Sequence, residues 1–169
     1  MQVSDGKNIA ASLKLAMRAT PSPVAIVTTV DESLRNRAGM AVSAFVPVSM
    51  EPPSMQICIN RSAGAYDLLL RNGTFCVNVL GIHQNEELAI FADPARRGER
   101  FANASWQGRH GALFLEGALS SIFCRTILTQ DVGTHCIMIG EVVEALVTDA
   151  PMPAVWHAGR MLAVNAGAA

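Results

Sequence analysis

The residues best placed to do chemistry begin in an apolar segment that carries unusually small side chains. Ala41, Ser43 and Ala44 stand where a strand normally carries bulk, between Gly39 and Val48. Small side chains leave the backbone N–H and C=O groups open, so a planar ligand could lie against them. This segment is therefore a candidate surface for a flat ring.

A candidate anion site follows at the tripeptide Asn60-Arg61-Ser62, just before a helical pattern. Ser is a favoured N-cap, a helix N-terminus attracts anions, and Arg61 adds a full positive charge. A ring surface beside an anion site indicates a ligand that joins a ring to a phosphate. The alternative is an ordinary hairpin that leads into a capped helix.

Two further polar segments could serve such a ligand. The basic loop with Arg96, Arg97 and Arg100 could add cations for phosphates, or it could be a solvated surface connection. The turn over residues 131–135 places His135 at the mouth of a strand. The alternative for His135 is a solvated turn residue.

The chain lacks the common motifs of nucleotide-binding folds, serine hydrolases and zinc proteases. It contains no G-x-G-x-x-G or G-x-x-x-x-G-K-[ST] loop, no G-x-S-x-G elbow and no H-E-x-x-H helix. The four cysteines form no C-x-x-C pair and show no metal-binding spacing with the four histidines, so no metal site is expected. An enzyme of this kind needs a cofactor for the difficult chemistry.

Composition indicates a single compact domain over residues 1–169. Hydrophobic residues make up 50% of the 169 and charged residues 16%, which excludes a disordered chain. The net charge of −1, from 13 Lys+Arg and 14 Asp+Glu, gives no electrostatic basis for nucleic-acid binding. The mean hydropathy of +0.28 is high for a small protein, so part of the surface should be covered, by default in a homodimer.

The sequence predicts a cytoplasmic protein that does not enter a membrane. The N-terminus is polar and charged and has no signal-peptide core, and no apolar run approaches the ~20 residues that span a bilayer. Cysteines inside apolar strand-like runs are expected to be reduced and buried.

Periodicity predicts strands that are interrupted by short helices. Helices are expected over residues 8–18 (capped by Asn8), 63–71 (ended by Asn72-Gly73) and 83–93 (ended before Pro94), and strands over 24–30, 39–48, 54–60, 75–80, 118–129, 136–147 and 156–164. A turn at Glu51-Pro52-Pro53 should join the second and third strands in a hairpin. Six or more strands joined in this way are typical of an antiparallel barrel rather than of a βαβ sheet.

Many short segments in a fixed order carry a family resemblance, although no single one is decisive. They are Ala16-Met17-Arg18, Val24–Thr29, Gly39-Met40, Pro52-Pro53-Ser54, Cys58–Ser62, Phe75–Leu80, Arg100-Phe101 with Trp106, Gly117-Ala118-Leu119, Cys124, Gly133-Thr134-His135 and Ile139–Val142. Over a core of about residues 10–165, the chain resembles the flavin reductase-like family of FMN-binding split-barrel proteins. It most resembles the small reductase component of two-component flavin monooxygenases of the hydroxyphenylacetate hydroxylase type.

The resemblance implies a mainly β fold, a six-stranded antiparallel Greek-key split barrel with flanking short helices, and a homodimer with flavin near its interface. It implies that the isoalloxazine ring lies along Met40, Ala41, Val42, Ser43, Ala44 and Phe45. The flavin phosphate is expected at Ser49, Asn60, Arg61, Ser62 and Arg97, and Tyr66 and Phe101 complete the implied cofactor contacts. These expectations agree with the ring-plus-anion interpretation of the residues themselves.

The resemblance also implies which residues face the nicotinamide. The chain departs from the family pattern in one segment. His135 matches a Gly-x-His turn that faces the nicotinamide in relatives, so it is the expected catalytic residue, and Arg160 is a weaker nicotinamide-binding candidate. Many relatives carry Gly-Met-Thr-x-Asn-Ser-Phe where this chain has residues 39–45 with Ala41, Ser43 and Ala44. Losing side-chain hydrogen bonds, at roughly 0.5–1.5 kcal/mol each, predicts weak flavin retention.

The function implied is an NAD(P)H:flavin oxidoreductase that reduces FMN or FAD by hydride transfer from NADH, or less favourably NADPH, and supplies a separate oxygenase component. The choices of flavin and of nicotinamide nucleotide stay open. The alternatives are a non-catalytic flavin-binding module, a split-barrel flavoprotein that reduces an organic substrate with bound flavin, and a structural subunit without flavin.

Overall fold

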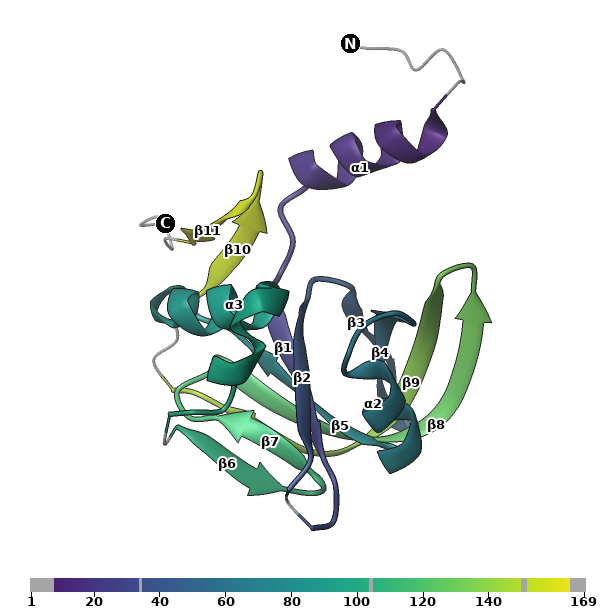
Figure 1. Ribbon diagram of the computed structural model, residues 1–169, viewed down its shortest axis with the longest axis vertical. Helices are drawn as coiled ribbons and strands as arrows, with labels where there is room; N and C mark the ends of the chain where they lie inside the picture. The colour runs from purple at the N-terminus through teal and green to yellow at the C-terminus, as the bar shows by residue number, and fades with distance from the viewer. Residues whose placement is uncertain (1–7, 34, 104, 150–151, 165–169) are drawn as a thin grey trace.

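The computed structural model describes residues 8–33, 35–103, 105–149 and 152–164, and the protein is mainly β (Figure 1). A seven-stranded antiparallel sheet has the order β2-β1-β5-β8-β9-β4-β3, and two ribbons, β6-β7 and β10-β11, accompany it. The strands are β1 (Ala25–Val30), β2 (Arg37–Val42), β3 (Phe45–Met50), β4 (Pro53–Asn60), β5 (Thr74–Val79), β6 (Trp106–Arg109), β7 (Ala112–Leu115), β8 (Ser120–Val132), β9 (His135–Val147), β10 (Ala154–His157) and β11 (Arg160–Ala163). The helices are α1 (Ile9–Ala19), α2 (Tyr66–Asn72) and α3 (Asn85–Ala92), with 3-10 turns η1 (Ile82–Gln84) and η2 (Pro94–Glu99).

Strand β1 lies at the centre of the core because it is apolar on both faces. All six of its residues are buried, and it pairs with β2 on one side and β5 on the other. Ala25 and Val27 join one apolar cluster, whereas Ile26 and Val30 join a second. A continuous apolar run is typical of a strand covered on both faces, so the strand predicted over residues 24–30 is confirmed.

The strand expected over residues 39–48 is instead two strands at opposite edges of the sheet. β2 pairs with β1, β3 pairs with β4, and the chain passes from one edge to the other at Ser43-Ala44. The hairpin around the cis Glu51-Pro52 bond is confirmed for β3 and β4, but its extension through β2 is wrong because β1 takes the β2 backbone as its partner. The sheet therefore has seven strands where the resemblance implied six.

Both ribbons differ from the sequence expectation. β6 and β7 were not predicted, because Gln107 and Gly108 interrupt any apolar alternation in β6. The single strand expected over residues 156–164 is a hairpin, and its turn at Ala158-Gly159 uses positive φ angles of 51° and 89°. The sequence pattern alone does not separate a hairpin of four-residue strands from one longer strand.

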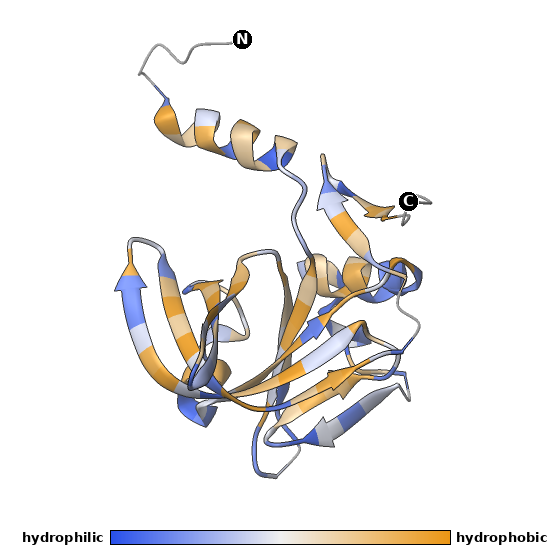
Figure 2. Cartoon of the chain, turned by 180° about the vertical axis from the view of Figure 1, so that it is seen from behind, coloured by the Kyte–Doolittle hydropathy of each residue, from blue (hydrophilic) through white to orange (hydrophobic). Residues whose placement is uncertain are grey.

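Helix α1 stands away from the rest of the chain in both views of the fold (Figures 1 and 2). The predicted cap is confirmed, since the Asn8 Oδ1 accepts a hydrogen bond from the Ala11 backbone N–H at 3.0 Å. None of the helix residues is buried, and Ile9, Leu13 and Met17 are 72%, 58% and 54% exposed. This apolar face has no partner among the described residues of one protomer.

The other two helices begin later than predicted. α2 starts at Tyr66, and its N-cap position is Ala65, so Ser62 is not a helix cap. Gly73 ends α2 as predicted, with a left-handed φ of 67°. The helix expected over 83–93 is divided into η1 and α3, and it ends before Pro94 as predicted. α3 packs against β2, which brings the following turn η2 to the same strand.

The described residues contain neither a membrane-spanning helix nor a cluster of metal ligands. No helix among them is long and apolar enough to cross a membrane, and no group of three or more His, Cys, Asp or Glu residues could hold a metal ion. All four cysteines are free thiols, and Cys76, Cys124 and Cys136 are buried as expected.

Candidate functional site

A cavity of about 400 Å³ opens beside the first half of β2. We call it the arginine cavity. It is lined by Arg35, Arg37, Ala38, Gly39, Gly64, Ala65, Arg97, Arg100 and Phe101. Three segments that are distant in sequence meet there: β2 with the loop before it, the loop after β4, and η2 with the residues that follow it. Four guanidinium groups around one cavity make it a site for an anion.

Gly39 allows the aromatic floor of this cavity to approach the sheet. A β-carbon at Gly39 would lie 2.8 Å from the Phe91 Cε1 and 3.1 Å from the Phe101 Cζ. The Phe91 and Phe101 rings pack edge to face at 5.0 Å, and both lie against Trp106, at 5.3 and 5.1 Å. The absence of a side chain at this position therefore serves protein packing.

Arg100 joins α3 and η2 to β2. Its guanidinium donates to the Gly39 carbonyl oxygen at 3.1 Å and to the Phe91 carbonyl oxygen at 3.0 Å, and its Cζ lies 5.3 Å from the Phe91 ring centre. Burial, followed by the nearby charge of Arg97, lowers the pKa of the Arg100 guanidinium. Two arginines thus lie close together beside the cavity, which raises the local positive potential.

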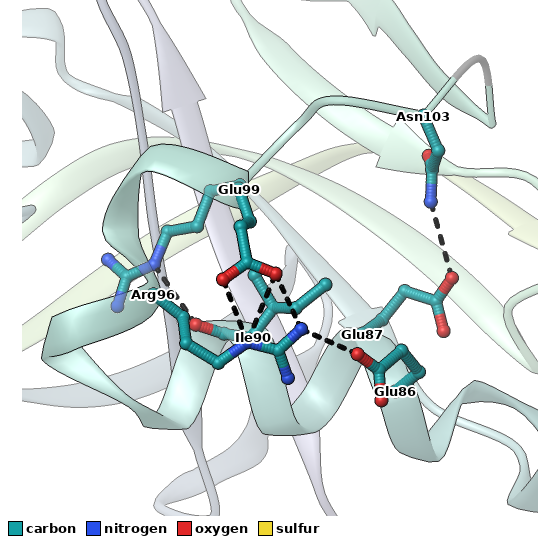
Figure 3. Close-up of polar contacts among 7 residues, drawn as sticks. Glu86, Glu87, Ile90, Arg96, Glu99 and Asn103 are labelled. Carbon is teal, nitrogen blue, oxygen red and sulfur yellow. Dashed lines mark hydrogen bonds and ion pairs between the residues drawn. The ribbon is translucent and has the colours of Figure 1, made fainter.

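The arginines of the predicted basic loop differ in their ion pairs. Arg96 is neutralised by two carboxylates, since its Nη2 lies 2.6 Å from an oxygen of Glu86 and 2.6 Å from an oxygen of Glu99 (Figure 3). Arg97 lies against Gly64, where a β-carbon would clash with its guanidinium. Among the described residues, no hydrogen bond or ion pair engages the Arg97 guanidinium. Arg97 is therefore the cation of this loop that remains available to a ligand.

Arg35 and Arg37 also line the cavity, and sequence reasoning missed both. They lie in the polar segment between the strands expected over residues 24–30 and 39–48, where no candidate site residue was predicted. Their two-residue spacing ahead of the small-residue segment was the available signal, because alternate residues of an extended chain point to the same side.

The polar groups of the tripeptide after β4 bond mainly to other groups of the protein. The Asn60 Oδ1 accepts hydrogen bonds from the Ser62 backbone N–H and from the Ser62 hydroxyl, both at 2.9 Å. The Arg61 guanidinium pairs with Asp131 at 2.8 Å, and both side chains are about half exposed. The helix cap that sequence predicted for Ser62 is thus replaced by a turn closed by Asn60, because α2 begins only at Tyr66 and the Ser62 hydroxyl donates to the Asn60 side chain.

The structure brings His135 to this tripeptide but leaves Ser49 apart from it. His135 is the register partner of Asn60 on β9, and its Nδ1 lies 2.9 Å from the Thr134 hydroxyl. Ser49 pairs with Ser54 at the other end of the β3–β4 hairpin. Six residues along β4 separate Ser54 from Asn60, roughly 20 Å at the usual rise of a strand. The expectation that Ser49 joins Asn60, Arg61 and Ser62 around one phosphate is therefore wrong for a single protomer.

The predicted ring surface, Met40 to Phe45, does not form one face. Val42 and Phe45 are buried in the core and Met40 packs against it, whereas Ala41 and Ser43 line a small, mainly apolar cavity of about 160 Å³ with Leu88 and Trp156. Ala44 is exposed at the crossing between the sheet edges. β2 is an edge strand, so its outer backbone groups have no ladder partner in the sheet.

Tyr66 and Arg160 lie outside the arginine cavity. Tyr66 is half-buried on α2, and desolvation, together with the charge of Asp131, raises the pKa of its hydroxyl. Arg160 lines another cavity, of about 490 Å³, with Trp156, Leu88 and Ala92. No contact among the described residues joins Arg160 to His135, which begins β9. The two predicted nicotinamide residues are therefore not neighbours within one protomer.

The donor set fits a flavin nucleotide. Arg35 and Arg97, whose guanidinium groups take part in no hydrogen bond or ion pair with another described residue, can hold a phosphate. The edge of β2 offers backbone groups to a ring system, and the cavity with Ala41 and Ser43 continues along the same segment. A single anion would use only the first of these features.

Comparison with known proteins gave one matching family model. The model described as "Flavin reductase like domain" matches residues 17–165 of this chain.

Named relatives and a solved structure agree with that match. The chain is 34% identical over 161 residues to the reductase component of FADH(2)-dependent resorcinol hydroxylase from Rhizobium sp. (strain MTP-10005), covering 94% of this chain and 89% of the relative. It is 38% identical over 141 residues to the FMN reductase (NADH) RutF of Pseudomonas syringae pv. syringae (strain B728a), covering 80% and 78%. The structure of the Streptomyces globisporus C-1027 NADH:FAD oxidoreductase SgcE6, in complex with NAD and FAD fragments, has a TM-score of 0.89 at 26% identity and covers all of both chains.

Proposed function

Because this chain belongs to the flavin reductase like domain family, we propose that it is an NAD(P)H-dependent flavin reductase that supplies reduced flavin to a separate oxygenase component. The observation that carries this function is the arginine cavity beside the open edge of β2. Among the named relatives, both FAD-linked and FMN-linked reductases occur. FMN or FAD is thus the flavin, and NADH is the favoured hydride donor.

The protein's part in catalysis is to bind and orient. When bound, the flavin supplies the chemistry by accepting a hydride from the nicotinamide. Arg97 would hold the flavin phosphate, and the backbone of β2 would fix the ring through N–H and C=O groups. Fixing two reactants at one distance and angle converts an encounter in solution into a reaction within one complex, which is where the rate gain arises.

His135 would orient the nicotinamide carboxamide or deliver a proton from its Nε2, because its Nδ1 is already held by the Thr134 hydroxyl. Asn60 and Ser62 would shape the same mouth, Arg61 could turn from Asp131 to a phosphate, and Tyr66 and Phe101 would border the flavin. Arg160 and its cavity would serve the nicotinamide nucleotide in the assembled protein.

The exposed apolar surfaces support a homodimer. The face of α1 with Leu13 and Met17 lacks a partner among the residues that the structure describes, and Val48 on β3 and Ile127 on β8 are about half exposed. A second copy that covers these surfaces would also carry its own His135 toward a neighbouring site. Sedimentation analysis of Leu13→Glu tests this: the unaltered protein should be a dimer and the variant largely monomeric.

The remaining structural features of the proposal are those of the family. The chain would form one domain over residues 1–169, its sheet would close as a Greek-key split barrel, and the protein would be cytoplasmic. Ala41, Ser43 and Ala44 offer few side-chain hydrogen bonds to a ring, so flavin should exchange like a substrate rather than stay bound. Stoichiometric flavin after extensive dialysis would contradict this exchange.

The test of function is the loss of NADH absorbance with purified protein and added FMN or FAD. Turnover that requires free flavin supports the proposal, and a parallel series with NADPH ranks the two donors. A yellow protein that binds flavin without oxidising either nucleotide would instead be a non-catalytic flavin-binding module. His135→Ala should lower turnover, and an unchanged rate and apparent affinity for NADH would remove the proposed role of this residue.

A further inference from the structure

The available cations of the arginine cavity come from two separate elements. Arg35 lies on the loop between β1 and β2, whereas Arg97 lies on η2. Neither guanidinium takes part in a hydrogen bond or ion pair with another described residue. Arg37 and Arg100 add positive charge to the same lining. The cavity therefore presents two available cations on two segments, and not one cluster at a single point.

The chain neutralises a neighbouring arginine that lies outside this lining. Arg96 sits between Glu86 and Glu99, and both carboxylates reach its guanidinium (Figure 3). These hydrogen bonds raise the pKa of Arg96 and lower that of Glu99. The same short turn thus carries one compensated arginine and one uncompensated arginine, Arg97. An arginine that lies in a cavity wall without a carboxylate partner is available to the phosphate of a ligand.

The loop that carries Arg35 is fixed in advance by Asp31. The Asp31 Oδ1 accepts hydrogen bonds from the backbone N–H of Arg35 at 3.1 Å and from the Ser33 hydroxyl at 2.9 Å, and its Oδ2 accepts from the Asn36 side chain at 2.5 Å. The hydrogen bond from Asn36 is the main cause that lowers the pKa of Asp31. A loop ordered before binding loses less entropy when its side chain grips a ligand.

We propose that the arginine cavity selects a ligand with two phosphates, FAD over FMN, with Arg97 on the flavin-side phosphate and Arg35 on the adenylate-side phosphate. This inference rests on the proposed function. A phosphate monoester carries nearly two negative charges on one group. A diphosphate bridge carries a comparable total charge on two groups. The spacing of the cations, and not their number, therefore decides which flavin binds more tightly. One phosphate cannot engage cations on two separate elements as well as two phosphates can.

Direct binding of three oxidised flavins tests the assignment without any need for turnover. Riboflavin has no phosphate, FMN has one and FAD has two, and each is titrated calorimetrically into the unaltered protein and into single variants. We expect Arg35→Ala to raise the dissociation constant of FAD about tenfold and that of FMN less than threefold. Arg97→Ala should weaken FMN and FAD alike, about tenfold, and leave riboflavin unchanged.

Arg109→Ala is the matched control, because Arg109 on β6 carries the same charge, pairs with Glu144 on β9 and lies outside the cavity. It should change none of the three constants by more than twofold. Equal weakening of FMN and FAD by Arg35→Ala, or no weakening of either, would overturn the inference. So would an effect confined to the apparent affinity for NADPH, which would assign Arg35 to the nicotinamide nucleotide. Failure of the unaltered protein to bind any flavin would instead overturn the proposed function.

Discussion

The guanidinium of Arg100 donates a hydrogen bond to the carbonyl oxygen of Gly39 at 3.1 Å, although 61 residues separate the two in sequence. The same side chain donates to the Phe91 carbonyl oxygen at 3.0 Å. One planar donor group therefore holds α3 and the end of η2 against β2. The wall of the arginine cavity depends on this contact, because Gly39 and Arg100 both line it.

Arg100→Lys should destabilise the fold although it keeps the charge. An ammonium group cannot reproduce the forked contacts, so at least one half-buried carbonyl loses its partner, and the free energy of unfolding should fall by about 1–3 kcal/mol. Urea denaturation measures the change. Arg125→Lys is the control, because Arg125 pairs with Glu141 in an exposed ion pair and should shift stability by less than about 1 kcal/mol. Equal shifts in the two variants would contradict this role.

Asn78→Ala should be among the most damaging polar substitutions. Asn78 is fully buried, and its amide nitrogen donates to the Ile26 and Leu113 carbonyl oxygens at 3.1 and 3.2 Å. Its Oδ1 accepts from the Leu115 backbone N–H at 2.9 Å and from the Ser121 hydroxyl at 3.0 Å. Removing this hub leaves several buried groups unpaired, so we expect a loss of about 2–4 kcal/mol in urea denaturation.

Asn103→Ala is the matched control for that substitution. Asn103 is exposed, and its amide nitrogen donates to Glu87 at 3.3 Å (Figure 3). Its loss should cost less than about 0.5 kcal/mol. If Asn78→Ala were as mild as this control, the buried network would not hold the β6–β7 ribbon to the sheet.

Much of the fold could be predicted where one local rule decides the outcome. Pro94 and Gly73 end helices for reasons that reside in their own backbones, and the apolar run of β1 identifies a buried strand without knowledge of its neighbours. The break at Ser43-Ala44 could not be predicted, because it depends on which strand takes β2 as a partner. Pairing is decided by the whole sheet, not by the segment.

In the candidate site, too, a local pattern predicts some residues, whereas others depend on contacts that only the fold creates. Arg97 was found because a basic loop is visible in sequence, but only the structure separates it from Arg96, which two carboxylates neutralise. Ser62 was given a capping role because serine is common there, yet α2 begins at Tyr66 and the Ser62 hydroxyl donates to Asn60 instead. Arg35 lies in the site because Asp31 fixes its loop through a hydrogen bond from the Arg35 backbone N–H. A contact of this kind between a side chain and the backbone leaves no periodic pattern in the sequence.

Stability should fall at alkaline pH because of a buried thiol. Burial raises the pKa of the Cys124 thiol to about 12, whereas an unfolded cysteine titrates near 8.5. The native state therefore holds a proton that the unfolded state releases, so this stabilisation is complete below about pH 8.5 and is lost as pH rises toward 12. Urea denaturation from pH 8 to 10.5 should show the decline, and Cys124→Ala should reduce its slope by up to about 1.4 kcal/mol per pH unit. An unchanged slope would show that other groups cause it.

Gly64→Ala should weaken phosphate binding without unfolding the protein. A β-carbon at Gly64 would clash with the Arg97 guanidinium, so the arginine must leave its place in the cavity wall, although the end of a flexible side chain can move at little cost to stability. We expect the dissociation constant of FMN to rise about tenfold and that of riboflavin to stay within twofold, since riboflavin has no phosphate. Gly98→Ala is the control on the same turn, because its β-carbon would meet no atom within 4 Å. Equal weakening of FMN and riboflavin in Gly64→Ala would mean that the substitution disturbs the ring surface, and Arg97 would then lose its assignment to the phosphate.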